Sequence, residues 1–318
     1  MNPAPLAAVT GGTGFLGLHL LPALAQAGFR IRLLARRDPS HPAFAGLAFE
    51  TLRGSLEDET ALAALADGAD VVVHAAGLIK AHTRAEFLHA NQGGAAALAR
   101  ATRRTAPGAR FVLISSLAAR EPQFSGYAFS KHAAEDAARD IFSDAPAQLA
   151  ILRPPAIYGP WDRETLALFR ASLYPVAPLL GDGIAAVIHA ADAAGAIAAM
   201  AGETFRPGCF ALADEQPQGY ALRVLMAEAA RATGGRARLA HLPKAMVMAA
   251  GFASGVLGGL RRTPPIFTLG KAREILHPDW SVRPDELLPR EIYAPRIGLA
   301  QGFAETVAWY RQAGWLRG

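Results

Sequence analysis

A glycine-rich loop near the beginning of the chain constrains the fold most. Residues 6–10 form a short apolar run that is typical of a buried strand, and a helical pattern extends from the loop to Leu24. The loop between them contains four glycines, Gly11, Gly12, Gly14 and Gly17. Between a strand and a helix, such glycines permit a tight turn, let bare backbone approach a pyrophosphate and let the helix pack closely. The N–H groups that begin the helix add donors for phosphate. The sequence therefore predicts a dinucleotide-binding loop.

Short apolar runs continue to alternate with helical patterns along the first half of the chain. We expect further strands at residues 29–35, 47–52, 70–74, 110–116 and 148–152. The longest helical pattern covers residues 84–104. Strands that are apolar throughout and alternate with helices form a parallel sheet covered on both faces. The predicted fold class is therefore α/β, a Rossmann-type doubly wound parallel sheet.

Two prolines, Pro154 and Pro155, stop regular structure and indicate where the chain leaves this sheet. We expect a dinucleotide-binding domain over residues 1–160. Residues 185–201 should return to it as a strand and an alanine-rich helix with Asp192 as N-cap. Residues 161–318 should mainly build a smaller C-terminal α/β lobe that binds substrate.

Several polar side chains fall where expected strands end, at the edge where parallel sheets bind ligands. His74 ends one strand, and Ser115 and Ser116 end another. Tyr127 and Lys131 follow, four residues apart in a helical segment, so both side chains lie on one face. A phenol with a pKa of about 10 is a poor base near neutrality, and a nearby ammonium favours its ionised form. The spacing alone also fits a half-buried tyrosine beside a solvated lysine.

Composition narrows the function classes. With 52% hydrophobic and 19% charged residues, the chain is typical of a compact globular protein. The net charge is +5, but the basic residues are scattered singly and in pairs, so no nucleic-acid partner is expected. Cys209 is the only cysteine, which excludes an intrachain disulfide and a cysteine-based metal site, and no metal is expected. No secretory signal pattern is visible, and the expected location is cytoplasmic.

The end of the second expected strand bears on the choice of cofactor. A carboxylate there would bind the ribose 2′-hydroxyl of NAD, whereas a guanidinium suits the 2′-phosphate of NADP. Arg36 and Arg37 occupy this point, and Asp38 comes after both. The sequence therefore predicts NADP rather than NAD.

Four motifs together resemble the extended branch of the short-chain dehydrogenase/reductase family, which includes nucleotide-sugar epimerases and dehydratases, dihydroflavonol reductases and 3β-hydroxysteroid dehydrogenases. They are residues 10–17, 113–116, 127–131 and 153–160, and they occur in the family's order. The resemblance implies that Tyr127 is the acid/base, that Lys131 lowers its pKa and holds the nicotinamide ribose, and that Ser116 hydrogen-bonds the substrate oxygen. Asn91 resembles a family asparagine on the preceding helix and is included in the catalytic set.

The motifs and the resemblance together indicate a set of residues that contact the cofactor. These are Gly11, Thr13, Gly14, Phe15, Leu16, Gly17, Arg36, Arg37, Ser55, Leu56, His74, Ala75, Ala76, Gly77, Lys131, Pro154, Ala156 and Ile157. One departure from the family pattern is Ser55, which stands where relatives usually have an aspartate close to the adenine.

The expected function is an NADP-dependent oxidoreductase that transfers hydride between nicotinamide and a small to medium carbonyl or hydroxyl substrate through a Ser-Tyr-Lys site. One alternative is a nucleotide-sugar epimerase or dehydratase with tightly bound NAD(P), and another is a non-enzymatic dinucleotide-binding sensor or assembly factor. Residues 153–155 look more like the steroid and flavonol reductases. Substrate contacts are expected from Lys80, His82, Phe87, Tyr158, Trp161 and Arg163.

Residues 245–260 are apolar throughout and are flanked by Lys244 and by Arg261-Arg262. This segment of 16 residues contains four glycines and is short for a membrane span. We expect a helix buried in the lobe or pressed against another subunit, with a membrane-surface contact as the alternative. The helices that contain Asn91 and Tyr127 could also pair two copies into a homodimer.

Overall fold

The chain forms two compact units in the computed structural model, which describes residues 3–236, 238–259, 264–265 and 267–316. Unit 1 comprises residues 1–153, 193–211 and 288–294, and unit 2 comprises residues 154–192, 212–287 and 295–318. Each unit is described by itself below.

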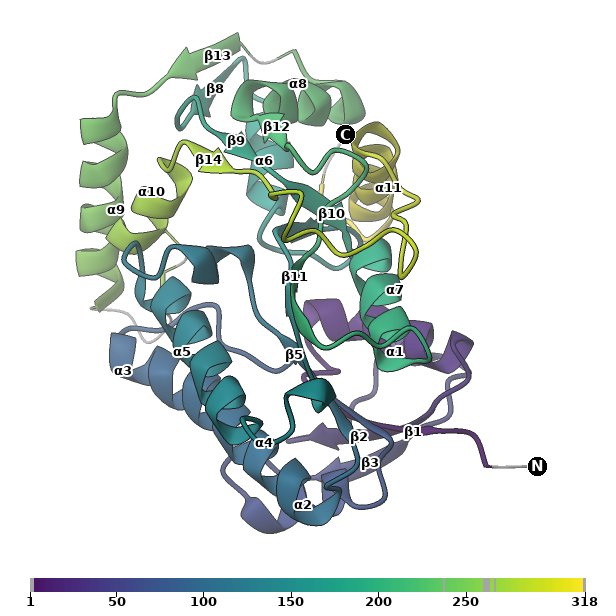
Figure 1. The fold of residues 1–318 in the computed structure, drawn as a ribbon. Helices are drawn as coiled ribbons and strands as arrows, with labels where there is room; N and C mark the ends of the chain where they lie inside the picture. Colours follow the sequence, from purple (N-terminus) through teal and green to yellow (C-terminus); the bar gives the residue numbers. More distant parts are fainter. Residues whose placement is uncertain (1–2, 237, 260–263, 266, 317–318) are drawn as a thin grey trace. The chain divides into compact units, whose positions relative to one another are not determined.

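A parallel sheet lies at the centre of unit 1 (Figure 1). Among the described residues it has seven strands in the order β11-β6-β5-β4-β1-β2-β3. The strands are β1 (Leu6–Thr10), β2 (Arg30–Ala35), β3 (Glu50–Arg53), β4 (Val71–His74), β5 (Arg110–Ile114), β6 (Leu149–Arg153) and β11 (Gly208–Ala211). The predicted Rossmann-type α/β fold is confirmed. Because β2 and β4 lie on opposite sides of β1, the strand order reverses there, which is where such sheets bind ligands.

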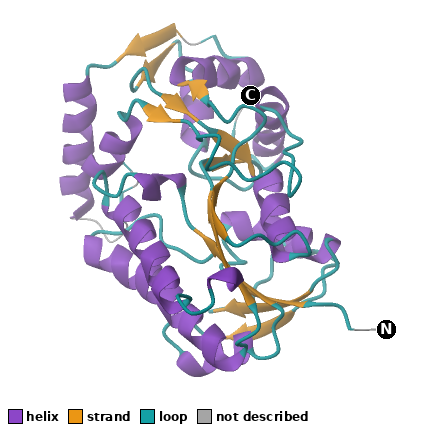
Figure 2. Cartoon of the chain, viewed as in Figure 1, coloured by secondary structure: helices purple, strands orange, loops and turns teal. Residues whose placement is uncertain are grey.

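Helices cover both faces of this sheet (Figures 1 and 2). They are α1 (Phe15–Gln26), α2 (Glu59–Ala66), α4 (Gly94–Thr105) and α5 (Gly126–Ile141), and α7 (Ala190–Ala201) joins the unit from its fourth residue on. In Figure 1, α2, α4 and α5 lie side by side on one face and α1 lies on the other. Leu62 of α2, Leu98 of α4 and Ala138 of α5 pack with Phe111 of the sheet in one buried cluster. This burial on both faces explains why the strands are apolar throughout.

The segment predicted as one helix over residues 84–104 is built from three pieces. It begins as α3 (Arg84–Phe87), widens into the π-helical turn η2 (Leu88–Gly93) and continues as α4. Asn91 lies in the wide turn and is buried. Such turns often occur at functional sites.

Unit 2 contains small sheets and helices around an aromatic core. Its strands are β7 (Ala156–Tyr158), β8 (Val176–Leu179), β9 (Ile184–Ala185), β10 (Val187–His189), β12 (Tyr220–Ala221), β13 (Arg238–His241) and β14 (Asp279–Trp280). Its helices are α6 (Leu166–Ala171), α8 (Leu222–Thr233), α9 (Lys244–Gly259), α10 (Leu269–Ile275) and α11 (Leu299–Gln312). Tyr158, Phe169, Phe303 and Tyr310 are the large side chains of the core.

Residues 193–201 belong to unit 1, but two details expected of residues 185–201 are wrong. The strand β10 does not return to the large sheet but pairs with β7, and the strand that extends the large sheet beyond β6 is β11. Asp192 lies inside α7, and its carboxylate accepts hydrogen bonds from the backbone N–H groups of Arg296 and Ile297. Asp192 therefore holds the backbone of the segment that precedes α11, and it does not cap a helix.

Helix α9 covers most of the apolar segment predicted at residues 245–260; residue 260 and Arg261-Arg262 lie outside the described residues. Within the parts of the chain that the structure describes, no helix has both the length and the apolar character needed to cross a membrane.

Candidate functional site

The glycine loop and the first turn of α1 lie so close together that only glycine fits at one position of each. Gly11 has a φ of 78°, and a Cβ on it would overlap the backbone of Ala75 and Ala76. A Cβ on Gly17 would overlap the carbonyl groups of Gly11 and Gly12. The loop therefore lies against the chain that follows β4 and against the first turn of α1. Gly14 begins α1 with no side chain to cap it, so the first N–H groups are available to a phosphate. Exposed backbone and free helix donors fit a dinucleotide pyrophosphate.

His74 ends β4 as a neutral, buried side chain. It is 1% exposed, and its Nδ1 lies 2.7 Å from Thr10 Oγ1 at the end of β1. Burial and the Lys131 ammonium lower the pKa of His74 to about 3. The imidazole therefore links the two central strands without carrying charge.

Lys131 is buried beside the strand end. Its Nζ donates a hydrogen bond of 2.7 Å to the carbonyl of Ile114, the last residue of β5. A Cβ on Gly77 would lie 3.4 Å from the same Nζ, so the residues after β4 approach the ammonium closely. Burial lowers the pKa of Lys131 to about 8, while the negative charge of Glu135 opposes this effect. Lys131 is consequently charged at pH 7 but releases its proton in mildly alkaline solution.

Tyr127 lies one turn before Lys131 in the first part of α5 and is half-buried. Its ring makes an edge contact with Phe87, with ring centroids 6.1 Å apart. The helix begins at Ser125, whose hydroxyl accepts a hydrogen bond from the N–H of Ala128. This cap fixes where the helix starts and hence the face on which Tyr127 and Lys131 stand.

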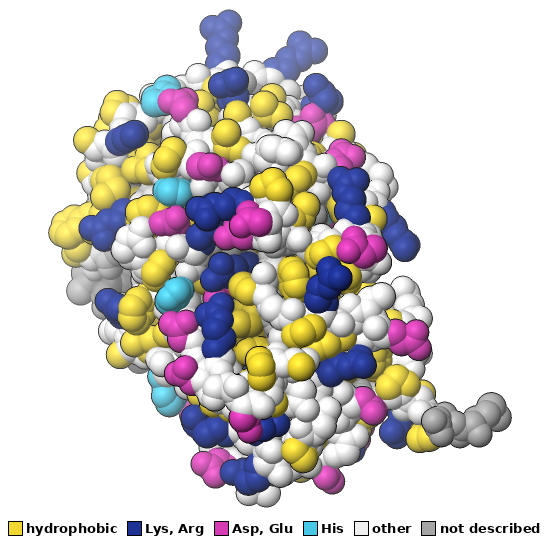
Figure 3. All heavy atoms as spheres, viewed as in Figure 1, with side chains coloured by type: hydrophobic (Ala, Val, Ile, Leu, Met, Phe, Trp, Pro, Cys, Tyr) yellow, Lys and Arg dark blue, Asp and Glu magenta, His cyan; other side chains and the backbone are white. Residues whose placement is uncertain are grey.

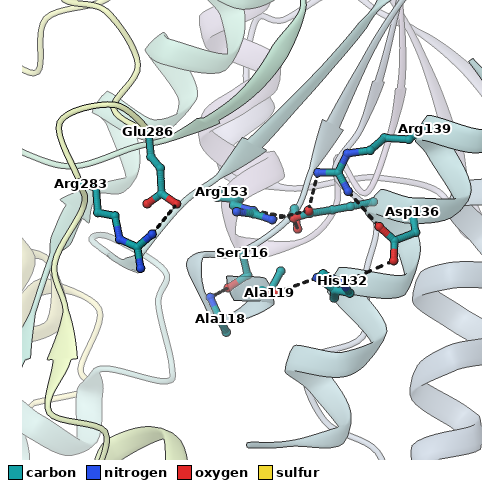
Figure 4. A network of polar contacts seen from close by, with 11 residues as sticks. Ser116, Ala118, Ala119, His132, Asp136, Arg139, Arg153, Arg283 and Glu286 are labelled. Carbon is teal, nitrogen blue, oxygen red and sulfur yellow. Dashed lines mark hydrogen bonds and ion pairs between the residues drawn. The ribbon is translucent and has the colours of Figure 1, made fainter. Parts of the chain in front are cut away.

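Glu135 lies one further turn along α5 after Lys131, and no motif in the sequence singled it out. The carboxylate is fully buried and accepts two hydrogen bonds from Arg153, of 2.8 and 2.6 Å, at the end of β6. It also accepts from Arg139 at 3.0 Å and from the Ser115 hydroxyl at 2.6 Å. Although burial raises its pKa, Arg153, Ser115 and Arg139 hold the pKa of Glu135 below its usual value. The side chains of Arg153 and Arg139 are labelled in Figure 4.

The two serines after β5 have different surroundings. Ser115 is 5% exposed and donates its hydroxyl to Glu135, which commits it to the buried ion pair. Ser116 is half-buried and begins the 3-10 helix η3 (Leu117–Arg120), where its Oγ accepts from the N–H of Ala118 (Figure 4). This bond leaves the hydroxyl hydrogen of Ser116 able to donate to a substrate oxygen.

Asn91 clamps the loop that follows β4. Its Oδ1 accepts from the N–H of Leu78 at 2.6 Å, and its Nδ2 donates to the Leu78 carbonyl and to Ser130 Oγ. The amide group thus fixes the loop to α5. We infer that Asn91 is a positioning residue. The loop that it holds presents two apolar side chains to solvent, Leu78 at 38% and Ile79 at 57% exposure, and the sequence analysis did not select them.

The remaining cofactor candidates of unit 1 lie beyond β2 and β3. Arg36 and Arg37 are exposed directly after β2. Ser55 Oγ accepts from the N–H of Glu57, and Leu56 packs against Gly94 of α4. Asp58 caps α2 through the N–H of Ala61, which gives this acid a structural role.

The substrate candidates differ in their surroundings. Lys80 is half-buried and His82 exposed on the loop before α3. Tyr158 is 1% exposed and packs between His189 and Phe303, so its burial argues against substrate contact.

Trp161 and Arg163 also pack within unit 2. Trp161 has a φ of 68°, and its ring contacts Trp309, while the Arg163 guanidinium lies 4.4 Å from the Trp315 ring centroid. Pro154, Ala156 and Ile157 likewise belong to unit 2. Among the described residues, no cluster of histidine, cysteine, aspartate and glutamate could hold a metal ion.

Comparison with known proteins adds a family and several relatives. Residues 7–208 match the NAD dependent epimerase/dehydratase family. The chain is 48% identical to the ceramide reductase of Caulobacter vibrioides (strain NA1000 / CB15N) over 311 residues, which cover 97% of this chain and 95% of the relative. Among solved structures, gox2253 superposes with a TM-score of 0.78 at 22% identity over 99% of this chain and 100% of that one. MoeE5 in complex with UDP-glucuronic acid and NAD gives a TM-score of 0.68 at 20% identity over 97% and 99%. These two likenesses show the fold.

Proposed function

Since this chain belongs to the NAD dependent epimerase/dehydratase family, in the extended short-chain dehydrogenase/reductases, we propose that it is an NADP-dependent reductase of a ketone on a ceramide-class lipid. Membership makes it an NAD(P)-dependent enzyme. The choice of NADP, of reduction and of a lipid substrate is the proposal. The near end-to-end match to the Caulobacter ceramide reductase is the observation that carries it.

The residues at the end of β5 and on α5 have the chemistry that ketone reduction needs. When bound, the nicotinamide supplies the hydride that the carbonyl carbon receives. Tyr127 donates its phenol proton to the carbonyl oxygen as that oxygen becomes an alkoxide, and the product is a secondary alcohol. The Lys131 ammonium stabilises the phenolate that remains, and Ser116 donates a hydrogen bond to the same substrate oxygen.

An apolar substrate is supported by the loop after β4. Leu78 and Ile79 are exposed, although apolar side chains of this size gain free energy when they are covered. Asn91 holds their backbone in place, and the neighbouring Gly77 lies beside the Lys131 ammonium. An acyl or long-chain base could therefore lie on these side chains while its ketone reaches Tyr127. NADP is supported by Arg36 and Arg37, which follow β2 where a 2′-phosphate would lie.

The function is tested with purified protein, NADPH and a ceramide whose long-chain base carries a ketone, dispersed in mixed micelles. We expect NADPH oxidation that depends on the lipid, and a lipid product heavier by H₂ in the mass spectrum. A parallel reaction with UDP-glucose tests the nucleotide-sugar epimerase alternative. Epimerisation of the sugar without net cofactor oxidation, and no reduction of the lipid, would overturn the proposal.

A further inference from the structure

Helix α9 has one face that packs into unit 2. Val247 is 1% exposed, and a Cβ on Gly251 would come within 2.9 Å of the Ala272 side chain and the Thr268 backbone of α10 and its cap. Gly258 packs in the same way against Pro265. The spacing of these residues places them on one side of the helix. The expectation of a helix buried in the lobe therefore holds for this side only.

The opposite face of α9 is apolar and open to solvent. Four large side chains on it are more than half exposed: Met246 at 56%, Phe252 at 62%, Val256 at 55% and Leu257 at 57%. Exposed alanines lie between them, and residues 245–259 include no charged side chain. Figure 3 shows hydrophobic side chains along the flank that α9 forms at the left of Figure 1. A continuous exposed apolar face of this kind marks an interaction surface.

The charge of the surrounding sequence is strongly one-sided. Residues 229–273 contain eight lysines and arginines and no aspartate or glutamate, in a chain whose total net charge is only +5. Six of these cations lie within the described residues: Arg231, Arg236, Arg238, Lys244, Lys271 and Arg273. Arg231 and Lys271 form ion pairs with Glu228 and Glu274, which border the stretch, so the excess positive charge comes from the other four. Lys244 opens α9 itself. An apolar helix face in a cationic stretch of chain complements a surface that is apolar inside and anionic outside.

We propose that α9 lies flat on an anionic membrane surface, with Phe252 and Leu257 inserted among the lipids. Its 16 residues are too few and its inner face too well packed for a span, whereas both features suit an interfacial helix. A second copy of the chain is a poorer occupant, because two such segments would bring like charges together. The proposed lipid substrate would be met at the same surface, although the docking does not require it.

The test is flotation of the purified full-length protein with vesicles of dioleoylphosphatidylcholine alone or mixed in equal amounts with dioleoylphosphatidylglycerol. Neither cofactor nor ceramide is present, so the result stands whether or not the enzyme reduces a lipid ketone. The test variant is Phe252→Glu/Leu257→Glu. The matched control is Ile184→Glu/Val224→Glu, which places the same charges at exposed apolar sites of unit 2 outside residues 229–273.

We expect the wild type and the control to float with the anionic vesicles, less at high salt, and hardly with the neutral ones. The test variant should partition at least about tenfold more weakly, because insertion of two charges replaces the burial of two large apolar groups. Circular dichroism checks that both variants are folded. Failure of the wild type to bind anionic vesicles, or equal binding by the test variant, would overturn the proposal. If the wild type and the control are dimers in sizing chromatography, the test variant is a monomer and none of them binds vesicles, the face belongs to a second copy of the chain instead.

Discussion

The sharpest stability prediction concerns the buried carboxylate of Glu135. In Glu135→Gln the shape is kept, but the charge that pairs with Arg153 is lost. Arg153 is only 15% exposed and makes two bonds to the carboxylate, so its guanidinium would stay buried beside a neutral amide. Removing one partner of such a pair costs about 3–5 kcal/mol. Arg139 is 41% exposed, and its share should be below about 1 kcal/mol.

Urea unfolding measures this loss. All four tryptophans, Trp161, Trp280, Trp309 and Trp315, lie in unit 2, so their fluorescence follows that unit, whereas far-UV circular dichroism follows both. The loss of about 3–5 kcal/mol should therefore appear in the dichroism transition that belongs to unit 1. The control is Glu50→Gln, which breaks the exposed pair with Arg32 and should cost less than about 1 kcal/mol.

The same substitution should change the pH dependence of turnover. Glu135 raises the pKa of Lys131 against the effect of burial, so without its charge that pKa should fall below about 8. Lys131 would then lose its proton at lower pH, and the alkaline limb of the turnover profile should move to lower pH. If Glu135→Gln unfolds like Glu50→Gln and leaves the alkaline limb unmoved, the network does not have the role assigned to it.

Three further predictions concern Lys131, the two arginines that follow β2 and the glycine loop. The pKa of Lys131 falls from 10.5 in the unfolded chain to about 8 in the folded protein. Between these two pH values the unfolded chain binds more protons, so the free energy of unfolding rises with pH. The variant Lys131→Met should remove about 3 kcal/mol of that rise in unfolding experiments. Arg36→Ala/Arg37→Ala should raise the KM for NADPH by about tenfold or more and leave that for NADH nearly unchanged, because only NADPH carries the 2′-phosphate. Gly11→Ala should destabilise unit 1 by more than about 1 kcal/mol and weaken NADPH binding in thermal-shift titrations, since both φ and space exclude a Cβ.

The lysine and glycine variants have matched control variants, and NADH is the control for the arginine pair. Lys271→Met removes a half-exposed lysine and should keep the alkaline rise. Gly28→Ala introduces a Cβ at a similar φ of 87° with nothing within 4 Å, so a cost equal to that of Gly11→Ala would mean that strain, not overlap, limits Gly11. An equal rise in both cofactor KM values would remove the arginines from 2′-phosphate recognition.

The parts of the fold that could be predicted from sequence are those with a local cause. The strand at residues 6–10 was predicted with its observed ends, because an apolar run and a glycine loop define both limits. The helix at residues 84–104 was correct in place but not in form. Its π-helical turn η2 packs against α5, and a helical pattern carries no signal for this contact between distant segments.

The predictions that failed, and the residues that were not predicted, depend on contacts between distant parts of the chain. Prolines and Gly159 flank Tyr158 in the sequence, which predicts a loop residue. In the fold, however, Phe303 packs against the ring and Tyr158 is buried. Glu135 could have been found as the next turn after Tyr127 and Lys131. Its partner Arg153, however, lies at the end of a later strand, and only the folded sheet brings the two together.

The central claim, that Tyr127 is the proton donor, is tested most directly by Tyr127→Phe in single-turnover reduction of the ketone-bearing ceramide with saturating NADPH. We expect nearly unchanged NADPH affinity and a hydride-transfer rate that is at least about a hundredfold lower, because only the phenol hydroxyl is removed. Tyr174→Phe, at a side chain that is 65% exposed in unit 2, should react at the wild-type rate. Wild-type turnover by Tyr127→Phe would contradict the account.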